Sequence, residues 1–254
     1  MMLEQAEFSG AHVRPSPNFG ERQTGQPDML LLHYTGMDKA EEALSWLCSE
    51  QSGVSAHYFV FEDGRIVQMV AEDKRAWHAG ASYWKGEEDN NSRSIGIEIA
   101  NPGHQGDYRS FPDVQIEAVI RLCRHCVDRW AIVPERVLAH SDIAPQRKQD
   151  PGEKFPWRSL FEAGIGHWVE PSLASGGRFL QMGDQGQPVE ALQAMLAYYG
   201  YQSEITGTFN DLVKANITAF QRHFRPAKVD GIADVSTIET LHKLLTALAE
   251  PAQK

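Results

Sequence analysis

A segment rich in glycine, serine and proline at residues 165–177 divides the 254-residue chain into two unequal parts. Segments of this composition lack the apolar periodicity of helices and strands, and they are typical of connections between folded units. The division predicts a first domain over residues 1–164, a linker, and a second domain over residues 178–250. The chain is long enough to bury its core without disulfide support, and it holds only three cysteines.

Strand-like and helix-like segments alternate in the first part of the chain. Residues 29–32 form an apolar run typical of a buried strand. Residues 94–100 alternate strictly, which places three isoleucines on one face. Strand-like runs on both sides of Asp63-Gly64 predict a hairpin, and apolar spacing predicts a long helix that begins at Pro112. We therefore expect an α/β domain with a central mixed sheet flanked by helices.

Three shorter segments of the first part also carry local signals. Asp38, followed three residues later by Glu41, predicts a capping box at the start of a helix that runs to about residue 50. Residues 1–28 are polar and rich in turn-forming residues, which predicts an irregular arm. Residues 136–140 predict a short strand that ends in a histidine.

The second part of the chain has only helical periodicity. Apolar residues recur at helical spacing from residue 188 to 199. Two similar motifs, at 207–210 and 231–234, then stand 24 residues apart, and each precedes another helical pattern. Asn210 and Asp234 are suited to cap these helices. The sequence therefore predicts a small all-α domain of three helices.

Composition excludes several classes of function. Lys and Arg total 24 against 34 Asp and Glu, a net charge of −10. Binding to nucleic acid or to an anionic membrane surface needs a clustered basic footprint, so we expect neither partner. We also expect no membrane span, since no apolar stretch approaches the roughly 18–20 residues required. The acidic start of the chain lacks the pattern of a secretory signal, which favours the cytoplasm.

Two histidines and one aspartate stand at positions suited to chemistry. His33 and His140 each follow a predicted strand, and Asp150 lies in a loop ten residues after His140. Strand ends and loops are where α/β scaffolds present reactive groups. Two imidazoles and a carboxylate leave a fourth tetrahedral position for water, as in catalytic zinc sites. A discontinuous set of this kind is a weak signal by itself, and the spacing also fits two hydrogen-bonded strand-end histidines and an aspartate that caps a turn.

Glu98 and Lys148 are candidates for acid–base and electrostatic roles. Glu98 lies opposite the isoleucine face of its strand, so its carboxylate points either into a site or to solvent. Lys148, two residues before Asp150, either faces the same centre or is solvated like most loop lysines.

Five blocks, in order, resemble zinc-dependent N-acetylmuramoyl-L-alanine amidases, and among these the branch that acts on 1,6-anhydro-muropeptides. The blocks are residues 32–36, 54–58, 77–84, 94–98, and 140–144 with 148–152, within a matching region of about 28–160. Residues 176–248 resemble the three-helix peptidoglycan-binding domain that is often fused to cell-wall hydrolases.

The resemblance implies one Zn²⁺ per chain, held by His33, His140 and Asp150, with Glu98 and Lys148 as the catalytic pair. It also implies substrate contacts. The predicted positions are Tyr34, Trp77, His78, Ala79, Trp84 and Asn91. The aromatic residues of this set either wall the groove and stack on sugar faces or belong to the core.

The implied activity is hydrolysis of the amide between the lactyl group of N-acetylmuramic acid, including 1,6-anhydro forms, and L-alanine of the stem peptide. Such an enzyme takes part in peptidoglycan turnover or recycling, with peptidoglycan or muropeptides as its partners. Two alternatives stay open: a protein that binds muropeptides without cleaving them, and a zinc peptidase that cuts within the stem peptide. A wall-binding second domain keeps the periplasm or cell envelope open as an alternative to the cytoplasm.

Overall fold

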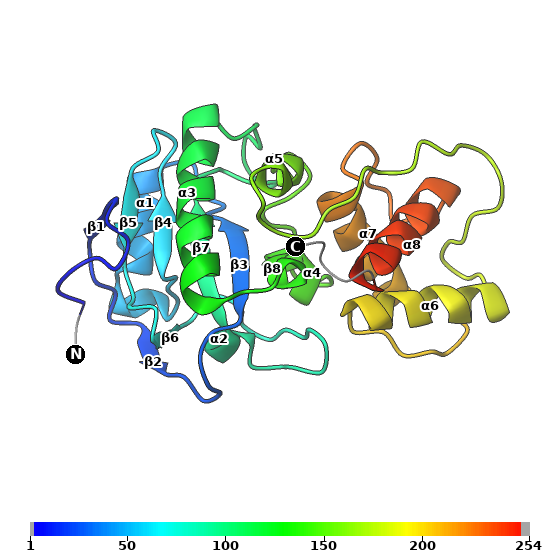
Figure 1. Ribbon diagram of the computed structural model, residues 1–254, viewed down its shortest axis with the longest axis horizontal. Helices are drawn as coiled ribbons and strands as arrows, with labels where there is room; N and C mark the ends of the chain where they lie inside the picture. The colour runs from blue at the N-terminus through cyan, green and yellow to red at the C-terminus, as the bar shows by residue number, and fades with distance from the viewer. Residues whose placement is uncertain (1–2, 250–254) are drawn as a thin grey trace.

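Six strands form the main sheet in the computed structural model, which describes residues 3–249 (Figure 1). The outermost ends of the two predicted domains, residues 1–2 and 250, lie outside this range. In spatial order the strands are β1 (Ala11–Val13), β5 (Ile66–Gln68), β4 (Tyr58–Val60), β7 (Ser94–Ile99), β3 (Met29–Tyr34) and β8 (Val137–Ala139). Neighbouring strands run parallel except at the β4–β5 hairpin, so the predicted mixed sheet is confirmed.

Helices cover both faces of this sheet. Helix α3 (Asp113–Trp130) packs on the isoleucine face, where Ile95, Ile97 and Ile99 join its apolar side chains in one buried cluster. Helix α1 (Ala40–Leu47) packs on the opposite face, in a second cluster with side chains of β4 and β5. Figure 1 shows the two helices on opposite sides of the strands. Glu98 therefore points away from α3, toward the face on which α1 lies.

Shorter elements complete the first domain. Strand β2 (Phe19–Glu21) pairs with β6 (Lys74–Ala76) in a separate antiparallel ribbon. The remaining helices are η1 (Glu50–Ser52), α2 (Asn90–Arg93), η2 (Pro134–Arg136), α4 (His140–Ile143) and α5 (Trp157–Glu162). Across residues 3–249, no helix combines the length and apolar character that a bilayer crossing requires.

Two local predictions in the first domain are corrected. Helix α1 begins one residue later than expected: Lys39 occupies the N-cap position in an extended conformation, with no side-chain hydrogen bond, so the predicted Asp38 capping box is wrong. The arm before residue 28 is not wholly irregular, because it supplies β1 and β2. Both strands pair with segments about 55 residues away in the chain, a tertiary pairing that no local pattern reveals.

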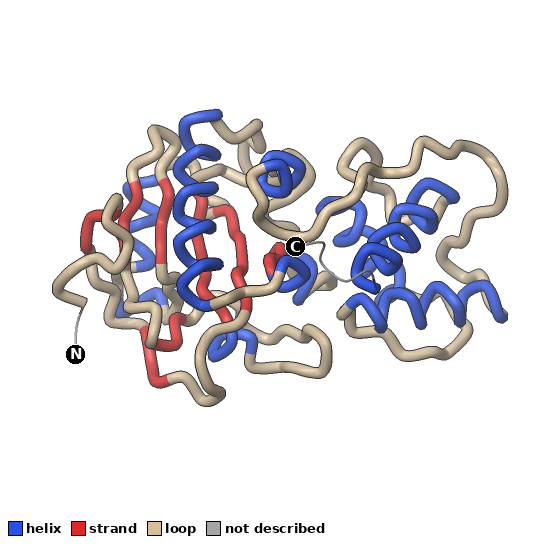
Figure 2. Tube along the Cα trace, in the orientation of Figure 1, coloured by secondary structure: helices blue, strands red, loops and turns tan. Residues whose placement is uncertain are grey.

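The second domain is the predicted bundle of three helices joined by loops (Figure 2). The helices are α6 (Gln187–Tyr199), α7 (Asp211–Phe224) and α8 (Val235–Ala249). Asn210 caps α7, because its side chain accepts a hydrogen bond from the Val213 amide at 3.1 Å. Asp234 makes the equivalent bond at the start of α8, 2.9 Å from the Thr237 amide. Both predicted caps are confirmed.

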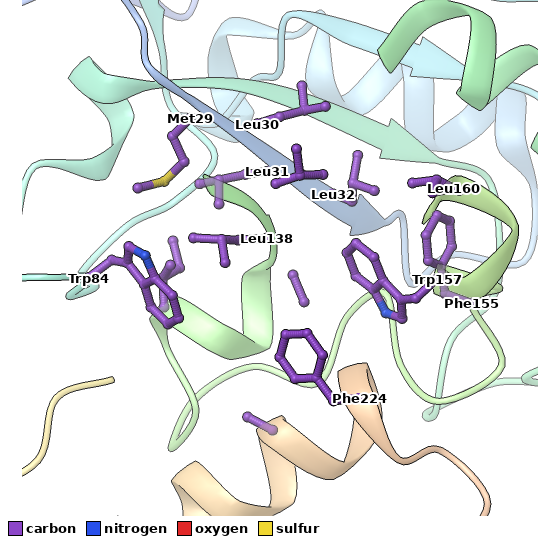
Figure 3. Close-up of a cluster of buried hydrophobic side chains, with 14 of the residues drawn as sticks. Met29, Leu30, Leu31, Leu32, Trp84, Leu138, Phe155, Trp157, Leu160 and Phe224 are labelled. Atoms are coloured by element: carbon purple, nitrogen blue, oxygen red, sulfur yellow. The ribbon is translucent and has the colours of Figure 1, made fainter. Parts of the chain in front are cut away.

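The two domains share one hydrophobic core. Trp84 from the first domain packs edge-on against Tyr199 and Tyr201, with ring centroids 6.0 and 5.0 Å apart. Figure 3 shows Trp84, Trp157 and Phe224 of α7 pointing into the same cluster. Trp168, within the predicted linker, is also buried there. The helical domain is therefore packed firmly on the sheet domain.

Candidate metal centre and cleft

The three predicted ligands meet at one edge of the sheet. His33 lies near the end of β3, and His140 is the first residue of α4, immediately after the neighbouring parallel strand β8. The two Nδ1 atoms are 2.8 Å apart, and Oδ2 of Asp150 lies 3.1 Å from Nδ1 of His33 and 2.9 Å from Nδ1 of His140. All three side chains are buried. The strand order thus brings together residues that are 117 positions apart in the chain.

Hydrogen bonds behind the ligands fix the orientation of both imidazoles. Nε2 of His140 lies 3.0 Å from the carbonyl oxygen of Ala79, which can only accept, so this nitrogen carries the proton. Nε2 of His33 lies 3.0 Å from Nδ1 of His78, and donation to that atom leaves Nδ1 of His33 unprotonated. Partners of this kind set the tautomer of metal-binding histidines. Both Nδ1 lone pairs therefore point toward Asp150.

Electrostatics give His33 and Asp150 the protonation states that a metal needs. Burial and, to a smaller extent, the neighbouring His140 lower the pKa of His33 to about 4. Burial acts to raise the pKa of Asp150, but the charge and hydrogen bonds of the two imidazoles outweigh it and hold that pKa below its ordinary value. At neutral pH, His33 is therefore a neutral imidazole and Asp150 is a carboxylate, and both lie beside the imidazole of His140. Two nitrogens and one oxygen suit a tetrahedral divalent ion with one position open, so the residues fit the implied metal.

Glu98 stands beside this cluster. It pairs with His33 across the parallel strands β7 and β3. Within the described part of the chain, its Oε2 atom is buried and makes no hydrogen bond. Burial raises the pKa of the carboxyl well above its ordinary value of 4.5, the charge of Asp150 raises it further, and the Lys148 ammonium opposes both. Buried polar atoms are almost always paired, so an orphan at this position points to a function in proton transfer.

A cleft of about 450 Å³ opens onto these groups. Its lining includes polar and charged side chains, among them Glu98, Lys148, His140 and Asp150. Its lining also includes apolar side chains, most of them from α1 and the segments on both sides of it: Met37, Ala43, Trp46, Leu47, Val54 and Trp77. A cleft with reactive polar groups and apolar surface suits a ligand that has a sugar or methyl face and a polar bond to be cut.

The structure divides the predicted substrate residues into two groups. Tyr34, Trp77 and His78 line the cleft. Trp84, Ala79 and Asn91 do not line it and are buried, so the structure places these three outside the cleft, and their contacts with substrate stay predictions.

Each of these three buried residues makes defined contacts inside the protein. Trp84 is 0% exposed, because its ring fills the core between the two domains. Ala79 contributes the carbonyl that orients His140. Asn91 accepts hydrogen bonds from the amides of His78 and Ala79 at 2.9 and 2.8 Å, and so shapes the loop behind the ligands.

Two residues of the site were not singled out from the sequence. A Cβ atom at Gly96 would lie 2.5 Å from Nδ1 of His78, so only glycine lets that ring reach His33. A glycine inside a strand often marks such a close approach, which is a usable sequence signal. Arg147 lines the cleft and donates to the carbonyl oxygens of Ala79 and Ala81 at 2.8 and 2.7 Å. Nothing local in the sequence marks Arg147.

Comparison with known proteins agrees with this geometry. A family model described as N-acetylmuramoyl-L-alanine amidase matches residues 23–153, and a peptidoglycan binding domain model matches residues 185–241. The N-acetylmuramoyl-L-alanine amidase AmiD from Escherichia coli is 39% identical over 231 residues, which are 85% of this chain and 82% of AmiD.

Solved structures extend the likeness over both domains. The complex of Escherichia coli AmiD with the substrate anhydro-N-acetylmuramic acid-L-Ala-D-γ-Glu-L-Lys has a TM-score of 0.75 and 34% identity, covering 92% of this chain and 99% of that one. AmpDh3 from Pseudomonas aeruginosa, in complex with anhydromuramic pentapeptide, has a TM-score of 0.73 and 31% identity, covering 97% and 99%. The chain belongs to the N-acetylmuramoyl-L-alanine amidase family.

Proposed function

We propose that the protein hydrolyses the amide between the lactyl group of N-acetylmuramic acid, including its 1,6-anhydro form, and L-alanine of the stem peptide. The observation that carries this proposal is the cluster of His33, His140 and Asp150 beside Glu98, whose buried Oε2 atom has no hydrogen-bond partner among residues 3–249. The family and the anhydromuropeptide bound in the AmiD complex support the choice of bond and substrate.

We propose Zn²⁺, one per chain, as the ion that these three ligands hold. When bound, such an ion lowers the pKa of a water to about 7 and polarises a carbonyl group. Glu98 accepts the proton of the attacking water and then delivers it to the departing nitrogen of L-alanine, which is otherwise a very poor leaving group. Its raised pKa favours the second transfer. The Lys148 ammonium stabilises the negative charge that develops on the carbonyl oxygen.

Incubation with defined substrates tests the proposal. The purified protein, with and without a chelator, is mixed with an anhydro-muropeptide, and the products are identified by mass spectrometry. We expect metal-dependent release of an intact stem peptide with a free L-alanine amino terminus. Shorter peptides would indicate a peptidase, and retention of the ligand without cleavage would indicate a binding protein.

Lys148→Ala tests the electrostatic role of the ammonium. Loss of one group that stabilises developing charge typically costs about 10²-fold or more in kcat, so we expect a fall of that size with metal content unchanged. Lys154→Ala is the matched control, because that lysine binds the carbonyl of Tyr108 and does not line the cleft. Equal activity of the two variants in a steady-state assay would remove the role assigned to Lys148.

We propose that the helical domain binds peptidoglycan, supported by the match of residues 185–241 to the peptidoglycan binding domain model. Sedimentation of the full chain with sacculi tests this, with Glu98→Gln in the background to prevent turnover. We expect the protein to pellet with the sacculi, and protein left in the supernatant would contradict the proposal.

A further inference from the structure

A buried carboxylate links the helical domain to the segment that carries one metal ligand. Asp142 lies in α4, two residues after His140, and is buried. Its Oδ2 atom accepts hydrogen bonds from the Ala139 amide at 2.8 Å and from Nδ1 of His223 at 2.7 Å. Its Oδ1 atom accepts one from the Tyr201 hydroxyl at 2.7 Å. Two of these three donors belong to the second domain.

The position of His140 depends on this carboxylate. Helix α4 has four residues, far too few to be stable without outside contacts. The bond from the Ala139 amide to Asp142 fixes the turn at which the strand ends and His140 begins. A buried carboxylate stays in place only if its hydrogen-bonding capacity is met, because each unmet bond leaves an uncompensated charge in an apolar surrounding. Tyr201 and His223 meet that requirement.

Helix α7 also reaches the segment that carries Asp150. Arg222 precedes His223, and its Nη2 atom lies 3.4 Å from Oε1 of Gln149 while its Nε atom lies 3.7 Å from Oε2 of Glu153. The His223 ring itself is held by stacking on Trp157, with ring centroids 3.7 Å apart. Helix α7 of the second domain thus contacts both the segment that carries His140 and the segment that carries Asp150.

We propose that Tyr201 and His223 are positioning residues of the metal centre. They hold Asp142, and through it His140, at the distance from His33 and Asp150 at which one ion is bound. The helical domain therefore completes the metal centre in addition to any contact it makes with the cell wall. This inference rests on the proposed metal and does not require the proposed hydrolysis.

Tyr201→Phe tests the inference in the full-length protein, with Tyr199→Phe as the control. Both changes remove one buried hydroxyl from the same interface, but the Tyr199 hydroxyl bonds to His167 at 3.0 Å and not to Asp142. Zn²⁺ affinity is measured by competition with a chromophoric chelator. Loss of a group that orients ligands costs about 10–100-fold in metal affinity, so we expect about a tenfold rise in Kd for Tyr201→Phe and none for Tyr199→Phe. The visible spectrum of the Co²⁺-loaded protein should change only in Tyr201→Phe.

A second pair of variants repeats the comparison at His223. His223→Asn keeps an N–H donor near the position of Nδ1, and His223→Leu removes it, so affinity should be weakened more by leucine. If Tyr201→Phe fails to fold, the comparison of His223→Asn with His223→Leu tests the inference instead. Equal Zn²⁺ affinity of the folded members within each pair overturns the inference, as does a parent protein that binds no metal. A parent protein that binds metal but cleaves no muropeptide overturns the proposed function and leaves this inference standing.

Discussion

Replacement of Glu98 by glutamine is expected to lower kcat on an anhydro-muropeptide by about 10²–10⁴-fold, the usual contribution of a general acid–base group. Glutamine has nearly the same shape but cannot accept and return a proton. Because Glu98 is not one of the three clustered ligands, the metal content should stay unchanged. Steady-state kinetics and elemental analysis of the same preparation check both expectations. A variant that keeps more than a tenth of the parent activity would exclude Glu98 as the proton carrier.

The same variant should be more stable than the parent when both are free of metal. Burial raises the pKa of Glu98 in the folded protein above its ordinary value of 4.5, so the folded state binds the proton more tightly than the unfolded state. The resulting stabilisation is complete below pH 4.5 and is lost as the pH rises through the raised pKa. Glu98→Gln should therefore unfold at higher urea concentration than the parent at pH 8, with a smaller difference near pH 4. Equal midpoints at both values would contradict the burial of an unpartnered charge.

Trp84→Ala is expected to cost about 3–5 kcal/mol in the free energy of unfolding, the range for removal of a large buried aromatic side chain. The Trp84 ring is fully buried and contacts Tyr199 and Tyr201 across the domain interface. Its loss leaves a cavity between the domains that neither backbone can easily close. Urea unfolding followed by circular dichroism measures the change, and a loss below 1 kcal/mol would show that the interface contributes little.

Trp77→Ala is the control for this experiment. Trp77 is only half-buried and lines the cleft, so its removal should leave most of the stability intact and raise KM for muropeptides. The two tryptophans lie seven residues apart in the sequence and share the same resemblance block, yet the structure separates a cleft residue from a core residue. A similar loss of stability in both variants would contradict that separation.

The difference between these tryptophans shows where sequence reasoning was sufficient and where it was not. Apolar runs and strict alternation predict β3 and β7 because a strand buried on one or both faces has a period that can be read locally. Nothing local shows that His33, His140 and Asp150 converge, since their meeting depends on strand order, and spacing alone left their roles open. The family resemblance supplied the ligand set, and the structure places the three donors within 3.1 Å of one another.

The groups behind the ligands were harder to predict for a physical reason. Ala79 acts through its backbone carbonyl, so the type of its side chain gives no sign of this role. Trp84 faces a domain that begins about a hundred residues later, and its aromatic ring would suit a sugar as well as a core. Two of the three hydrogen bonds to Asp142 come from helix α7 and the residues after α6. Interactions between distant segments of this kind depend on the assembled fold.

The continuous core between the domains has a consequence for the way a polymer would be handled. A binding domain on a flexible linker samples a volume that is set by the length of the linker. Here Trp168, within the connection, is buried in the core that the two domains share, so packing helps to set the position of the helical domain relative to the cleft. A glycan strand bound to the helical domain would therefore approach the catalytic groups at a distance and in an orientation that this packing determines. The protein would then cleave stem peptides that lie at a set distance from the point at which the glycan strand is bound.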